Sequence, residues 1–230
     1  GARIYCQHIS SAASVEMIRR AKAEGIKIYA ETCPHYLTLT DAAIAGSKEY
    51  WAGDGADYRN VFTGAGREAA LPQWSAYDTL FKMNPPLGSV EDRSSIINGL
   101  RDGTIDVLSS DHAPHCRYEK EVEFDQAPFG IIGLETEIGL ALTRLYHTGA
   151  LILSALIDKF TRTPAALLGI RKGALTVGYD ADITVLDLDA EWIYDPQQGA
   201  SKASNSPFAG WPVKGRAVAT WVAGEEVWKL

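Results

Sequence analysis

The chain opens on short apolar, partly β-branched runs that alternate with segments of helical periodicity. Arg3–Gln7 and Lys27–Thr32 have the pattern of strands. Between them, apolar residues three positions apart predict a helix that opens at Ser10 or Ser11 and stops at Gly25. Because strands and helices that alternate in this way form parallel sheets, the pattern predicts an α/β fold.

The alternation resumes further along the chain. Thr79–Met83 and Ile105–Leu108 are predicted as a third and a fourth strand, and the helix between them has a capping pair, Ser89 and Asp92, and a stop at Gly103. Four strand-helix units are therefore expected within residues 1–170. Additional helices are expected at Leu37–Ile44, around Ile138–Leu145, at Leu153–Phe160, and from Thr163-Pro164 to Gly169.

Two segments depart from this pattern. Residues 45–78 interleave glycines with aromatic residues and lack periodicity, so we expect an insertion there: a lid, an oligomer contact, or a variable surface segment without a catalytic part. From Gly173 onward the pattern is that of strands, which predicts a small β-rich subdomain over residues 171–230 with a loop at Asp195–Pro212. The strands are expected at Ala181–Leu186, Trp192–Tyr194, Arg216–Val222 and Glu226–Trp228.

Composition narrows the classes of function. With 46% hydrophobic residues the chain can bury a core, and its net charge of −7, with scattered Lys and Arg, gives no basic surface for nucleic acid or an anionic membrane. No apolar run approaches the roughly 20 residues of a membrane span. Cys6, Cys33 and Cys116 lack the spacing of a disulfide framework or a thiolate zinc site. We therefore expect a cytoplasmic protein that acts on a small molecule.

Polar side chains follow each predicted strand: His8, His35, Asn84 and Asp111. The carboxyl ends of parallel strands meet on one face of a barrel, so these groups are expected to lie together. Two imidazoles and a carboxylate suit zinc. The alternative for any one histidine is a structural role, and for the segment around Asp111 it is a surface loop whose carboxylate caps a turn.

Six motifs, in order, carry a resemblance to a known family: CQHISS, ETCPHYLTLTD, FKMNPPL, DVLSSDHAPH, APFGIIGLET and GYDADITVLDLD. Together they resemble the class I dihydroorotases of the amidohydrolase superfamily. That family's barrel opens with a strand bearing His-x-His and an Arg, and a later strand supplies a Lys or Asp that bridges the metals. This chain lacks these features and begins at what would be the fifth strand. The resemblance thus implies the C-terminal half of a (β/α)8 TIM-like barrel, followed by the β-rich subdomain.

The resemblance also implies a binuclear zinc site. His8 and His35 would bind one ion, while Asp111 would bind the other and act as the general acid/base of the reaction. His112 would orient Asp111 or its loop without binding metal.

The substrate-binding residues implied by the resemblance are Asn84, His115 and the backbone amides near Phe129 and Gly130. The reaction implied is the interconversion of N-carbamoyl-L-aspartate and dihydroorotate in pyrimidine biosynthesis. Gly88 stands where the family commonly has Arg, which leaves the substrate open among cyclic amides.

Two other functions remain open at this stage. One is an allantoinase or hydantoinase, although hydantoinases usually have Gln where His35 stands. The other is a non-catalytic scaffold that partners a carbamoyltransferase. The chain by itself is expected to be inactive, and to associate with a missing N-terminal half or to form a homo-oligomer.

Overall fold

The computed structural model describes residues 2–46, 58–64, 66 and 72–230. Half of the insertion predicted at residues 45–78, namely 47–57, 65 and 67–71, lies outside the described residues. A parallel sheet of three strands, β1 (Ile4–Cys6), β2 (Ile28–Thr32) and β3 (Val107–Leu108), has β2 in its centre. Cys6 pairs with Ala30, and Thr32 pairs with Leu108. The predicted α/β class is confirmed.

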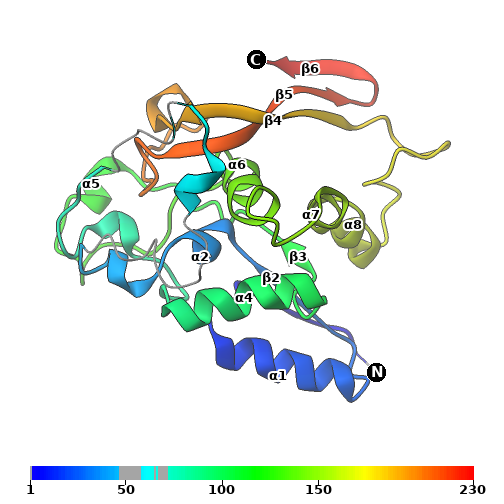
Figure 1. Cartoon of the computed structure of the whole chain (residues 1–230), viewed down its shortest axis with the longest axis horizontal. Helices are drawn as coiled ribbons and strands as arrows, with labels where there is room; N and C mark the ends of the chain where they lie inside the picture. Colours follow the sequence, from blue (N-terminus) through cyan, green and yellow to red (C-terminus); the bar gives the residue numbers. More distant parts are fainter. Residues whose placement is uncertain (1, 47–57, 65, 67–71) are drawn as a thin grey trace.

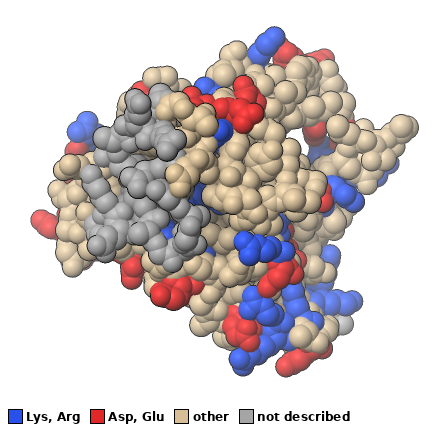
Figure 2. All heavy atoms as spheres, in the orientation of Figure 1, with Lys and Arg blue, Asp and Glu red and all other residues tan. Residues whose placement is uncertain are grey.

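Two helices, α1 (Ala12–Ala23) and α4 (Val90–Asp102), lie side by side beneath this sheet (Figure 1). Both begin where their caps predict: the Ser11 side chain accepts from Ser14 N, and Ser89 and Asp92 form a reciprocal capping box. Apolar residues of each helix are buried, and the outer surface carries both signs of charge in close proximity (Figure 2). The two helices therefore act as one amphipathic layer.

The third predicted strand is wrong. Thr79–Phe81 forms a single 3-10 turn instead, because the Asp78 side chain accepts a hydrogen bond from Leu80 N at 2.9 Å and caps it. Phe81 and Met83 are buried, so the alternation that resembled a strand reflects packing against the core. The parallel sheet consequently has three strands among the described residues, one fewer than expected.

The shorter helices surround the carboxyl ends of the strands. The helix expected at Leu37–Ile44 begins earlier, as α2 (Pro34–Thr38), with proline at its first position, and a 3-10 turn follows it. The remaining helices and turns are η1 (Asp41–Ala43), η3 (Tyr58–Val61), η4 (Thr79–Phe81), α5 (Arg117–Lys120), α6 (Glu137–Ala141), η5 (Leu142–Tyr146, a π-helix), α7 (Leu153–Phe160), α8 (Arg162–Leu168) and η6 (Pro196–Gln198). Within the described ranges, no helix has both the length and the apolar character needed to cross a membrane.

An antiparallel sheet of β4 (Ile183–Ile193), β5 (Pro212–Val222) and β6 (Glu225–Lys229) lies over α6, at the top of Figure 1. The two strands expected between residues 181 and 194 are one long strand, because bulges let the pairing with β5 continue through irregular register. Trp211, Val213 and Phe208 are buried in the same hydrophobic core as residues of the first half of the chain. The antiparallel sheet thus packs on α6 and η5 and shares one hydrophobic core with the first half of the chain.

Candidate metal and substrate site

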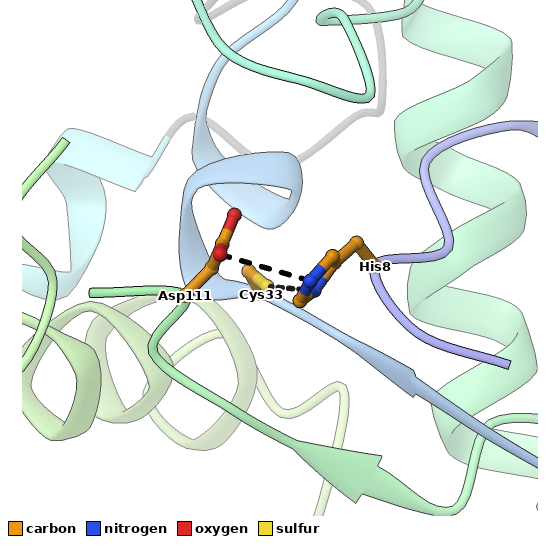
Figure 3. Close-up of side chains that lie close together, drawn as sticks. All are labelled: His8, Cys33 and Asp111. Carbon is orange, nitrogen blue, oxygen red and sulfur yellow. Dashed lines mark hydrogen bonds and ion pairs between the residues drawn. The ribbon is translucent and has the colours of Figure 1, made fainter. Parts of the chain in front are cut away.

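His8, which follows β1, and Asp111, which follows β3, face each other across the end of the central strand β2 (Figure 3). Nε2 of His8 lies 3.7 Å from Oδ1 of Asp111. Both residues have left-handed backbones, with φ of 55° and 47°. Such conformations are costly for residues with a Cβ and collect at functional sites, so the chain bends at these two points to aim the side chains at one place.

Cys33, at the end of β2, is the third close side chain. Its Sγ lies 3.7 Å from Nδ1 of His8, and one ligand atom from each of His8, Cys33 and Asp111 falls within 4.8 Å of the others. Burial, with smaller effects from its neighbours, raises the pKa of the Cys33 thiol well above its usual value. Because metals bind the thiolate, Cys33 is a weaker ligand at neutral pH than its position suggests.

His35 is the second residue of α2 and is only 2% exposed. It lies outside the group of three, but close enough to His8 for their charges to interact: burial, helped by His8, lowers the pKa of His35 to about 3. The ring is therefore neutral, and its buried Nε2 has no hydrogen-bond partner among the described residues. A buried nitrogen of this kind costs about 1–3 kcal/mol unless it is satisfied. A cation between His8, His35 and Asp111 would satisfy it, so the donor set fits a metal.

Glu31 supports His8 from the central strand, and sequence reasoning missed it. Its Oε1 lies 3.2 Å from Nδ1 of His8, and its Oε2 accepts from the Tyr5 hydroxyl at 2.6 Å. Glu31 is 6% exposed, and a carboxylate within an otherwise apolar β2 was the signal that could have revealed it. A carboxylate on the second ring nitrogen of a metal-binding histidine fixes its orientation and raises its basicity.

The predicted substrate-binding residues lie along two adjoining loops. Nε2 of His115 donates to the Phe129 carbonyl at 2.8 Å, and Gly130 N donates to Lys82 O at 2.9 Å. Gly130 has φ of 110°, a conformation open mainly to glycine. Asn84 is exposed and lies two residues beyond Lys82 in the chain. The structure therefore brings His115, Phe129 and Gly130 into contact, and Asn84 belongs to the segment whose Lys82 carbonyl Gly130 contacts.

His112 contacts the protein backbone and does not join the group formed by His8, Cys33 and Asp111. Its Nδ1 accepts from the backbone N–H groups of Gly133 at 3.1 Å and Leu134 at 3.4 Å, and it forms a parallel bridge with Ile131. It therefore ties the Asp111 loop to the segment that leads into α6. This contact agrees with the supporting role expected of it.

Residues 6–227 match the family model described as the amidohydrolase family. The chain belongs to this family. Two curated relatives are proteins named dihydroorotase: one from Pelotomaculum thermopropionicum is 44% identical over 99% of this chain, and one from Geobacter metallireducens is 43% identical over 98%. The chain spans 46% of the length of each relative. The resemblance predicted from the motifs is confirmed.

Two solved amidohydrolase-like structures overlie nearly all of this chain. An L-hydantoinase (dihydropyrimidinase) from Arthrobacter aurescens has a TM-score of 0.80 and 32% identity over 100% of this chain and 45% of that protein. A dihydropyrimidinase from Brevibacillus agri has a TM-score of 0.81 and 23% identity over 99% of this chain and 45% of its own, which shows a shared fold. The predicted fold class, half of a barrel with a small β-rich part, is confirmed.

Proposed function

We propose that this amidohydrolase-family chain provides the C-terminal half of a dihydroorotase. Such an enzyme interconverts N-carbamoyl-L-aspartate and dihydroorotate by opening or closing a cyclic amide. The observation that carries the proposal is the pairing of His8 with Asp111 at 3.7 Å, beside a buried His35 whose Nε2 lacks a partner in the described chain. The names of the relatives that share 43–44% identity support the same reaction.

Zinc is the metal that this donor set favours, since neutral imidazoles and a carboxylate are typical zinc ligands. His8, His35 and Asp111 would hold it. Zinc supplies a Lewis acid for the ring carbonyl and lowers the pKa of a water molecule. Two ions fit the proposal, because the other half of the protein would contribute ligands of its own.

The chain's own residues have distinct tasks in the reaction. Asp111 accepts the proton of the attacking water and passes it to the ring nitrogen as the carbon–nitrogen bond breaks. Asn84, His115 and the backbone of Phe129 and Gly130 bind the ring and carboxylate of the substrate. These substrate-binding groups hold the substrate in a fixed position relative to the attacking water. Glu31 holds His8 in the orientation that faces Asp111.

The arrangement of the chain supports two units, residues 1–170 as the half barrel and residues 171–230 as the β-rich part. β1 pairs with β2 on one side and, among the described strands, with none on the other. The half of the relatives' length that this chain does not cover would complete the barrel along that edge. We therefore propose that activity requires that N-terminal half, either in the same polypeptide or as a separate chain.

The assay that tests the function uses a protein containing both halves and three substrates: dihydroorotate, hydantoin and allantoin. We expect turnover of dihydroorotate. We expect D111N to lower kcat by about 10³-fold or more, because proton transfer of this kind contributes about 10²–10⁴-fold. D189N makes the same chemical change at an exposed position of β4 and should leave kcat unchanged. A wild-type protein that ignores dihydroorotate would refute the proposal.

A hydantoinase is the second candidate, and it rests on the Arthrobacter aurescens structure, at 32% identity and a TM-score of 0.80. In that case hydantoin would be hydrolysed faster than dihydroorotate in the same assay. His35 favours the dihydroorotase over the hydantoinase, since hydantoinases usually have Gln at that position. A scaffold without catalysis would bind less than about 0.5 zinc per chain and would turn over none of the substrates.

A further inference from the structure

Asn205 belongs to the segment between η6 and β5, and its side chain reaches into the substrate loops. It is 5% exposed and lies 90 residues after His115 in the chain. The sequence pattern indicates only a loop at Asp195–Pro212, without any role in a site. The fold delivers this one side chain from the β-rich part to the region where substrate is expected to bind.

Every polar atom of the Asn205 side chain is engaged with those loops. Oδ1 accepts from His115 N at 3.1 Å, while Nδ2 donates to Ala113 O at 3.0 Å and to Gly130 O at 3.2 Å. Its backbone carbonyl also accepts from Ile132 N at 3.0 Å. An amide is the side chain that fits, because it offers one acceptor and two donors on a short stem.

These bonds set the spacing of two loops that are already in close contact. Ala113 N donates to Ile131 O at 2.8 Å, and a Cβ added to Gly130 would lie 2.5 Å from the Cβ of Ala113. Asn205 joins the same two loops at a second point, because its one amide group bonds both the loop of His115 and the loop of Gly130. Without it, the His115 backbone N–H and the Gly130 carbonyl would lose a shared partner.

We propose that Asn205 is a positioning residue that sets substrate affinity by fixing His115 and Gly130 relative to each other. This inference rests on the proposed function and extends it to the β-rich part of the chain. Asn205 acts through the substrate-binding groups, so its loss should raise KM more than it lowers kcat. In this way residues 171–230 take part in substrate recognition as well as in packing.

Three variants of the protein that contains both halves test the proposal with dihydroorotate. N205A removes all three side-chain bonds and should raise KM roughly tenfold, with kcat within about threefold of wild type. N205D keeps the shape and the acceptor, but it turns an oxygen toward the carbonyls of Ala113 and Gly130. It should therefore raise KM at least as much as N205A. N98A, on the exposed face of α4, is the matched control.

The order of the two variants distinguishes positioning from simple space filling. If Asn205 only fills space, the isosteric N205D would raise KM less than N205A does, or both variants would keep the KM of wild type and lose only the fraction of zinc-loaded enzyme. Either result overturns the proposal. Hydrogen exchange of the His115 amide, measured without substrate, should be faster in N205A, which lacks the acceptor oxygen, than in wild type and N98A. Unchanged exchange also overturns it.

The exchange measurement separates this proposal from the proposed function. If wild type turns over no dihydroorotate, the function is wrong, and the exchange of the His115 amide alone decides whether Asn205 positions the loop. If wild type is active and KM is unchanged in both variants, the function stands and the role of Asn205 falls.

Discussion

At the residue scale, the polar side chains that follow the strands could be predicted, whereas their supports could not. His8 and Asp111 stand directly after apolar runs, so their place at the sheet edge follows from the chain order. Cys33 joins them because β2 ends beside β1, a fact of pairing that local pattern does not contain. Glu31 and Asn205 act through contacts 23 and 90 residues away in the chain, beyond any local motif.

The carboxylate of Glu31 gives a prediction at this scale. In the protein with both halves, E31Q should weaken zinc binding by about 10–100-fold, because Gln keeps the shape but loses the negative charge that orients His8. Competition with a chelator of known zinc affinity measures the change. E24Q, an exposed glutamate at the end of α1, is the control and should bind zinc like wild type. Equal affinity for E31Q would show that His8 is held without Glu31.

At the element scale, the helices with strong caps were predicted well and the short irregular ones were not. The Ser89 and Asp92 pattern and Gly103 defined α4 from sequence because capping chemistry is local. Thr79–Phe81 failed because burial of Phe81 and Met83 imitates strand alternation when the neighbours that bury them are distant in the chain. The side chain of Asp78 caps the turn that forms at Thr79–Phe81 instead.

Asp92 links two helices and yields a stability prediction. It accepts from Ser89 N at 2.8 Å within its own capping box and from Ala12 N at 2.7 Å in the first turn of α1. We expect D92N to lower the stability of the two-half protein by about 1–3 kcal/mol and S89A by about 1 kcal/mol, because only D92N disturbs both helix starts. Thermal melting measures both, with E91Q as the control. A milder effect for D92N than for S89A would contradict this account.

The same residue predicts a dependence on pH. Partial burial raises the pKa of Asp92, but the hydrogen bonds donated by Ala12 and Ser89 outweigh it, so its pKa lies below the usual value. A depressed pKa in the folded state means that the carboxylate stabilises the protein above the unfolded pKa of about 3.9, and that this stability is lost as pH falls through the folded value. The gap in melting temperature between wild type and D92N should therefore be full at pH 7 and shrink below about pH 4. A constant gap would rule Asp92 out as the source.

At the scale of the whole molecule, the motifs indicated half a barrel, and the structure shows the surface that this leaves open. β1 has an unpaired edge among the described strands, and beside it lies a cavity of about 420 Å³ lined by Arg3, Ile4, Tyr5, Tyr29, Pro164, Leu167 and Leu168. Ile4 is 47% exposed and Leu168 is 73% exposed. An open strand edge next to apolar side chains is a surface for pairing with another chain. Sequence alone could not reveal this patch, because its members come from β1, β2 and α8.

This surface predicts how the chain behaves with and without the other half. Alone, the chain should self-associate through the β1 edge, and a separately expressed N-terminal half should convert it to one defined complex that size-exclusion chromatography resolves.

L168K should reduce the self-association of the isolated chain, because a charge interrupts the patch, and it should weaken the complex for the same reason. M17K, at a 72% exposed methionine on α1, is the control and should change neither. The contrast with M17K is the decisive feature, since a general change in solubility caused by one added lysine would alter both associations in M17K as well. If the unmodified chain is a monodisperse monomer that does not bind the N-terminal half, the β1 edge is not the surface that completes the barrel.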